Sequence, residues 1–117
     1  MRYMFLLYIE DRPAPGTPEA GPYYAALMSF HQECRERGVL VRADPLQAPS
    51  AAKTVRVRAG KPLSTDGPFA ETTEWLAGYF LLDCRDEDEA LELARLCPVS
   101  SEGSVEIRPI WDGAASG

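Results

Sequence analysis

Two strand-like segments of this chain are apolar at both odd and even positions, and this pattern constrains the fold more than any other feature. Residues 2–10 read RYMFLLYIE, and residues 74–84 read EWLAGYFLLDC. A strand with one face in water alternates apolar and polar residues, whereas a strand that is apolar on both faces needs cover on both sides. We therefore expect a sheet whose two faces are both buried.

Two helices are predicted to accompany these strands. Over residues 23–37 the apolar side chains recur at helical spacing, and Gly38 follows where a C-terminal cap belongs. The second helix follows Asp86, which forms a capping box with Glu89, and this helix ends before Pro98.

Three further segments have the character of strands. Residues 39–46 (VLVRADPL) predict a strand that ends at Pro45, and residues 104–112 predict a half-buried last strand. Residues 53–69 predict a β-hairpin, because valines alternate with arginines before a turn at Gly60.

This order of elements predicts an α+β fold: a ferredoxin-like split β-α-β arrangement with an inserted β-hairpin, and an antiparallel sheet with two helices on one face. Two helices leave the second sheet face open, and no segment remains to cover it. We expect a second copy of the chain to do so, in a symmetric homodimer with two sheets face to face. Residues 1–112 form a single domain in this prediction and residues 113–117 a flexible tail. A cavity between or beside the sheets is the expected ligand site.

The composition excludes several classes of function. With 117 residues, a net charge of -6 and an isoelectric point of about 4.7, the chain lacks the clustered cations that bind nucleic acids or anionic membranes. No apolar run approaches the roughly 20 residues of a bilayer span, and the N-terminus has no signal-peptide pattern, so a cytoplasmic protein is expected. Three cysteines without CxxC spacing predict buried free thiols, and a single histidine predicts no metal site. The sequence contains no phosphate loop, so no cofactor is predicted.

The stretch TDGPFAETTEW, residues 65–75, is the most unusual in the chain. Gly67 before Pro68 favours a sharp turn, and Phe69 is expected to anchor that turn in the core. Asp66 has two interpretations: it accepts hydrogen bonds from the amides of the turn, or it is a catalytic carboxylate.

The second interpretation gathers several side chains at the mouth of one pocket. Asp66 and Glu71 are the candidate catalytic carboxylates, because a carboxylate held against an apolar wall has the raised pKa that a general base requires. Arg56 would hold an anionic substrate. Three more side chains are candidates for substrate binding: Glu74, Phe69 and Tyr79.

His31, the only histidine, lies on the flank of the apolar stripe of the first predicted helix. It is either a partly buried structural residue or an acid–base partner of Asp66, because a histidine beside a carboxylate is held in one tautomer. His31 is therefore included among the candidate catalytic residues.

The chain resembles the YCII-related family, in the subgroup named for the Asp-Gly-Pro-Phe tetrapeptide found here at residues 66–69. The likeness extends over nearly the whole chain, through MRYMFLLY, ERGVLVRADPL, KTVRV, DEDEALELARLCP and VEIRPI in the same order. The resemblance implies a dimeric α+β barrel with a small-molecule site near the tetrapeptide, and no reaction is established for the subgroup. Relatives in the broader family use a His-Asp pair, whose histidine lies in a local motif that is not found around His31.

Proteins that resemble this chain often lie beside genes for extracytoplasmic-function sigma factors, which is an association and not a mechanism. The chain departs from the family pattern at Thr73, where a lysine is usual. We therefore predict a homodimer that binds an unknown small molecule. It is either a cofactor-independent enzyme with carboxylate acid–base chemistry or a non-catalytic binding or regulatory module associated with a sigma factor.

Overall fold

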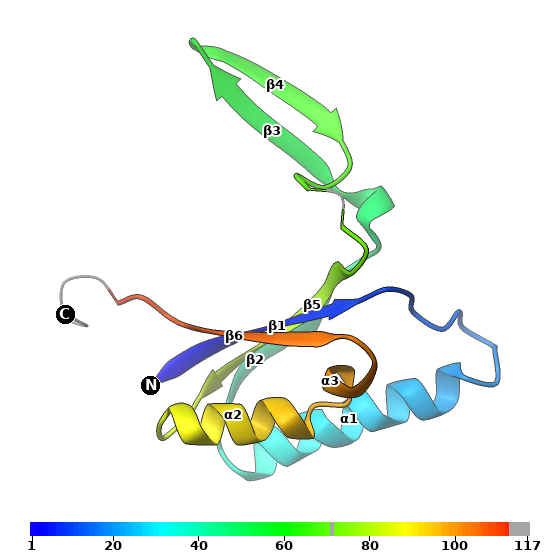
Figure 1. Ribbon diagram of the computed structural model, residues 1–117, viewed down its shortest axis with the longest axis vertical. Coiled ribbons are helices and arrows are strands. Elements are labelled where there is room, and N and C mark those ends of the chain that lie inside the picture. Colours follow the sequence, from blue (N-terminus) through cyan, green and yellow to red (C-terminus); the bar gives the residue numbers. More distant parts are fainter. Residues whose placement is uncertain (71, 113–117) are drawn as a thin grey trace.

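The computed structural model describes residues 1–70 and 72–112, and its centre is an antiparallel sheet with helices on one side (Figure 1). The sheet has the strand order β2-β5-β1-β6 and consists of β1 (Arg2–Ile9), β2 (Leu40–Pro45), β5 (Trp75–Asp83) and β6 (Ser104–Pro109). The helices are α1 (Ala20–Glu36), α2 (Glu87–Leu96) and the short α3 (Val99–Glu102), which was not predicted. The predicted α+β fold is confirmed, and none of the described helices is long and apolar enough to cross a membrane.

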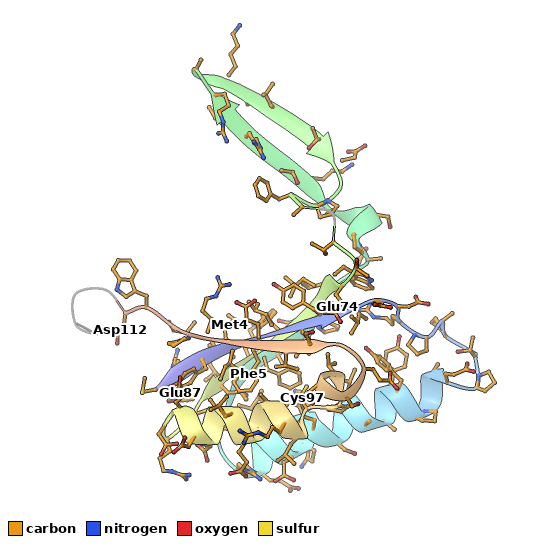
Figure 2. All side chains as sticks on the ribbon, viewed as in Figure 1. Met4, Phe5, Glu74, Glu87, Cys97 and Asp112 are labelled. Atoms are coloured by element: carbon orange, nitrogen blue, oxygen red, sulfur yellow. The ribbon has the colours of Figure 1, made fainter. Side chains whose placement is uncertain are left out.

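The two faces of the sheet differ in their surroundings. Side chains at odd positions of β1, such as Phe5 and Leu7, are buried against the helices, where they pack with Phe30 and Leu93. Side chains at even positions of β1, such as Met4, are half-buried on the opposite face. Figure 2 shows Phe5 on the side of the helices and Met4 on the other side. We call this second side the open face.

Both long helices end or begin as their sequences predict. The Asp86 carboxylate accepts a hydrogen bond from the Glu89 amide at 2.9 Å, so the predicted N-cap of α2 is present. Gly38 follows α1 with a φ of 74°, the left-handed conformation of a C-terminal glycine. Helix α1 begins at Ala20, three residues before its predicted start. Pro22 is compatible with this start because the amides of the first helical turn have no partner within the helix.

The predicted hairpin is present, but it stands apart from the main sheet. Strands β3 (Lys53–Arg58) and β4 (Lys61–Asp66) pair only with each other, and the turn between them has positive φ at Ala59 and Gly60. A short 3-10 helix, η1 (Pro49–Ala51), leads into β3. Figure 1 shows the helices on one side of the sheet and this hairpin projecting away on the other. We call residues 53–66 the arm.

One expectation about the turn after the arm is wrong. Phe69 does not anchor the turn in the core, because 74% of this residue is exposed and its ring lies 4.8 Å from the Arg56 guanidinium carbon. The turn is held instead by the backbone, since the Gly67 amide donates to the Ala52 carbonyl at 2.7 Å. Glu71 and the predicted tail, residues 113–117, lie outside the described residues.

Candidate functional site

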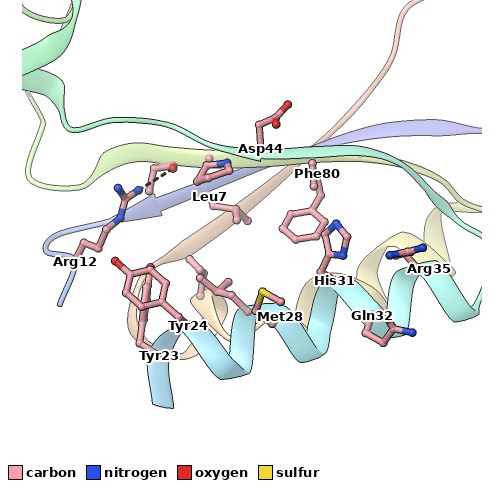
Figure 3. Close-up of a pocket in the computed structure, with 16 residues that line it drawn as sticks. Leu7, Arg12, Tyr23, Tyr24, Met28, His31, Gln32, Arg35, Asp44 and Phe80 are labelled. Atoms are coloured by element: carbon pink, nitrogen blue, oxygen red, sulfur yellow. Dashed lines mark hydrogen bonds between the residues drawn. The ribbon is translucent and has the colours of Figure 1, made fainter. Parts of the chain in front are cut away.

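A cavity of about 560 Å³ lies between α1 and the helix-facing side of the sheet (Figure 3). This cavity lies within one chain, and the predicted ligand site between or beside the two sheets of a dimer stays a prediction. The inner wall of the cavity consists of apolar residues from the sheet and the helices: Leu7, Leu27, Ala43, Ala77, Phe80 and Val99. A cavity of this size and lining fits one small organic molecule.

Helix α1 contributes the polar side of the cavity. Tyr24, Met28, His31 and Arg35 all line it, and they are spaced three or four residues apart, so they form one row along the helix. His31 is half-buried, and its ring meets the Phe80 ring edge-on with 6.0 Å between the centroids. His31 is thus the residue in this row whose imidazole ring can both donate and accept a hydrogen bond at the cavity wall.

Arg12 lies at one end of the cavity, although it comes from the proline-rich loop after β1. One guanidinium nitrogen, Nη2, donates to the carbonyls of Leu46 and Ala77, both at 3.0 Å. The guanidinium carbon also lies 5.0 Å from the centre of the Trp75 ring. These contacts fix the cation in place before any ligand arrives.

Arg35 lies near the other end of the cavity from Arg12, with His31 between them (Figure 3). The Arg35 side chain forms no ion pair within residues 1–70 and 72–112. Its guanidinium therefore has all its donors available for an anion within the described part of the chain.

Tyr23 adds a phenol beside Arg12. Burial raises the pKa of Tyr23 above its usual value, while the nearby Arg12 guanidinium acts in the opposite direction. The phenol therefore stays protonated near neutral pH and can donate a hydrogen bond into the cavity.

The predicted catalytic group is divided between two parts of the chain. Asp66 ends β4 on the arm, its side chain is 84% exposed, and it accepts a hydrogen bond from Lys53 at 2.5 Å. His31 lies on α1, on the other side of the sheet (Figure 1). The expected convergence of Asp66, Arg56 and His31 on one pocket mouth is therefore not found within a single chain. The reason is that the arm pairs with itself and not with the sheet.

The remaining predicted binding residues also lie outside the cavity. Tyr79 is on the open face, where its hydroxyl donates to the Asp44 carboxylate at 2.6 Å. Arg42 donates to the same carboxylate at 2.7 Å. The hydrogen bond from Tyr79, followed by that from Arg42, lowers the pKa of Asp44. Glu74 precedes β5 and accepts a hydrogen bond from the Ser104 hydroxyl at 2.8 Å.

Sequence reasoning found one residue of this cavity, His31, as a site residue and missed the two arginines. The row on α1 could have revealed Arg35, because residues 24, 28, 31 and 35 have helical spacing beside the core stripe. Arg12 could not have been found, because its contacts with Leu46 and Ala77 depend on long-range packing. Among the residues that the structure describes, no three His, Cys, Asp or Glu side chains are placed to hold a metal ion.

Comparison with known proteins places the chain in a family. An uncharacterized protein of Rhizobium meliloti (strain 1021) is 46% identical over 88 residues, which are 74% of this chain and 68% of that protein. A similar solved structure is that of 5-chloro-2-hydroxyhydroquinone dehydrochlorinase from Burkholderia phenoliruptrix AC1100, in complex with 2,5-dihydroxybenzoquinone. The two structures share a TM-score of 0.55 at 10% identity over 98% of each chain, which shows a common fold. The YCII-related domain matches residues 1–113, so the chain belongs to the YCII-related family.

Proposed function

We propose that the cavity between α1 and the sheet binds a small organic anion with an apolar or aromatic body. One observation carries this proposal: an apolar cavity of about 560 Å³ has Arg12 at one end, Arg35 at the other and His31 between them. An arginine pairs with a carboxylate through two parallel hydrogen bonds and donates charge-assisted hydrogen bonds to a phenolate oxygen, and the apolar wall accepts the rest of the molecule.

The reaction that fits this site is proton transfer without a cofactor. The ligand would be held by its anionic group, and His31 would take up or deliver a proton at an adjacent atom of the ligand. Catalysis by Asp66, as predicted from the sequence, would need this carboxylate to approach a ligand from outside the cavity of its own chain, and Glu71 lies outside the described residues. Their role stays a prediction.

The similar solved structure suggests a chemical class for the ligand. That protein was solved in complex with 2,5-dihydroxybenzoquinone, a small planar ring with acidic hydroxyl groups. A ligand of the same class would match the apolar wall and the two arginines of this chain. The alternative is a non-catalytic module, linked to a sigma factor in the prediction, which would use the same cavity for binding alone.

Calorimetric titration with 2,5-dihydroxybenzoquinone tests the binding site. We expect saturable binding of one molecule per chain, weakened about tenfold or more in Arg35→Gln. The matched control is Arg37→Gln, because Arg37 is on the same helix but is paired with Glu33 and Glu92 and does not line the cavity. No saturable binding, or equal losses in both variants, would reject this site.

Proton transfer can be measured separately from binding, as hydrogen exchange in deuterated water. Exchange of the ring hydrogens of the same probe, followed by proton nuclear magnetic resonance, should be faster with the protein than without it. The variant His31→Gln should remove this acceleration while the probe still binds. If the unmodified protein binds the probe and does not accelerate exchange, the non-catalytic alternative is favoured.

We also propose that the chain is a homodimer whose open sheet faces pack together. The open face presents half-buried apolar side chains, among them Met4, Leu6 and Leu81. Two ion pairs lie on this face, Arg42 with Asp44 and Arg108 with Glu106. Covering such a face buries apolar area, and the four charges of these two pairs are already partnered within the chain. Sedimentation equilibrium should give a dimer at micromolar concentration, and Leu6→Lys should give a folded monomer.

A further inference from the structure

We propose that the arm docks on the second copy of the chain and forms a separate part of the dimer interface. This inference rests on the proposed homodimer and adds a contact surface to it: the valine-bearing face of β3 and β4. The surface follows from the register of the hairpin and from the direction in which it projects.

The arm has two chemically different faces. Val55 pairs with Ser64 and Val57 pairs with Pro62, and residues opposite each other in a hairpin share a face. The only charges on this face are Lys53 and Asp66 at its base, and they form an ion pair. We call this the valine face; it is apolar and has no net charge.

The other face of the arm is cationic. Arg56 pairs with Leu63 and Arg58 pairs with Lys61, so three cations lie together around one leucine. Phe69 covers part of Arg56. The arm is therefore an amphipathic ribbon with a neutral apolar face and a face that carries three positive charges.

Such a ribbon cannot bury its own apolar face. Val55 is 65% exposed and Val57 is 58% exposed, although both lie in regular strand structure. A hairpin of two strands is at best marginally stable alone, because it needs a third strand or a second layer packed on its apolar side chains. The main sheet of the same chain does not supply that layer, since β3 and β4 pair only with each other and carry no core residue.

The direction of the arm identifies a second copy as the occupant. The arm projects on the side of the sheet opposite to the helices, which is the side of the open face (Figure 1). A copy that covers the open face therefore lies beside the arm. Because the dimer is symmetric, each arm would pack its valine face on the partner, and the contact would occur twice.

The distribution of charge along the chain also favours a second copy as the partner of the arm. The arm contains four of the twelve Lys and Arg residues and one of the eighteen Asp and Glu residues, so its formal charge is +3 and that of the rest of the chain is -9. The arm of one copy is thus attracted to the acidic body of the other. A nucleic acid would meet the same acidic body and be repelled by it.

A pair of matched variants tests the docking. Val57→Lys adds a charge to the valine face, and Leu63→Lys adds the same charge to the cationic face at a residue of similar exposure, 53% against 58%. Neither residue is in the core, so both variants should fold. We expect the dimer dissociation constant from sedimentation equilibrium to rise about tenfold or more for Val57→Lys and less than about twofold for Leu63→Lys.

The results for these variants distinguish docking of the arm from dimerisation through the open face. If Leu6→Lys dissociates the dimer while Val57→Lys and Leu63→Lys both associate as the unmodified chain does, the open face is the interface and the arm does not dock. A monomeric unmodified chain rejects both ideas.

Hydrogen–deuterium exchange provides a second, independent measurement. The amides that join β3 and β4 should become more protected as the protein concentration rises through the dissociation constant. Rapid exchange at every concentration would overturn the docking of the arm, whatever the state of the open face.

Discussion

His31 on α1 meets Phe80 on β5 edge-on, with ring centroids 6.0 Å apart and an angle of 61° between the ring planes. Phe80 in turn contacts Phe30 in the core, at 5.1 Å between centroids. The wall of the proposed ligand cavity and the hydrophobic core therefore share one aromatic side chain. Changes to Phe80 should affect stability as well as binding.

Replacing Phe80 with alanine should destabilise the protein by about 3–5 kcal/mol, because a nearly buried ring is lost and the space cannot close completely. Phe69→Ala makes the same chemical change at a residue that is 74% exposed, and it should cost no more than about 1 kcal/mol. Urea unfolding of both variants measures the difference. Similar losses would show that Phe69 is buried in solution.

Asp86→Ala should destabilise the fold by about 0.5–2 kcal/mol, because the Glu89 amide at the start of α2 loses its partner. Asp88→Ala removes an equal charge from the same turn without removing the cap. In about 0.5 M salt, where charge effects are screened, Asp88→Ala should cost only a few tenths of a kcal/mol. If the two variants unfold at the same urea concentration in high salt, the capping bond contributes nothing measurable.

Gly103→Ala should be strongly destabilising. A Cβ atom at this position would lie 2.1 Å from the Tyr8 carbonyl oxygen, so β6 could not keep its place beside β1. Overpacking of this kind costs about 1–3 kcal/mol or more. The control is Gly21→Ala in α1, where a Cβ meets nothing within 4 Å and the helix should gain up to about 1 kcal/mol. Thermal unfolding that ranks the two variants in the reverse order would contradict this packing.

Because of the three buried thiols, the stability of the fold should fall at alkaline pH. Burial raises the pKa of Cys34 to about 12 and the pKa values of Cys84 and Cys97 to about 11. An unfolded thiol has a pKa of about 8.5, so above that pH the unfolded chain releases protons that the folded chain keeps. The stabilisation is complete below about pH 8.5 and is lost as the pH rises toward 11 and 12.

Urea unfolding at several pH values measures this effect. Cys97→Ala should lower stability at neutral pH by its packing loss, and its stability should then fall less steeply than that of the unmodified chain between about pH 8.5 and 10. Tyrosine and lysine titrate in both proteins, so the difference in slope belongs to the removed thiol. Parallel slopes would place Cys97 in contact with water.

The sequence predicts the individual strands and helices because their signals are local. The alternation in β3, the cap at Asp86 and the glycine at position 38 each depend on neighbouring residues. The direction of the arm is different, because it is set by the connections at residues 46–52 and 67–74, which carry no periodic pattern. The sequence therefore does not reveal that Asp66 and the cavity beside α1 lie on opposite sides of the sheet.

The cavity illustrates the same limit. His31 is a candidate from the sequence because it is the only histidine. Its ring contact, Phe80, has the same sequence pattern as any other core residue. Arg12 stands in a loop of prolines and glycines, and only the folded sheet brings the Ala77 carbonyl to it. Residues whose roles depend on such distant partners cannot be found from local patterns.

The arm, which we propose to contact the partner, is structurally separate from the cavity, which we propose to bind the ligand. Because β3 and β4 hydrogen-bond to each other and not to the sheet, substitutions there leave the register of β1, β5 and the cavity wall unchanged. Over evolution, the proposed partner contact of the arm and the proposed ligand of the cavity can then change at different rates. Family members with the same cavity need not recognise one another, and a set of paralogues in one cell could stay unmixed through differences in the arm alone.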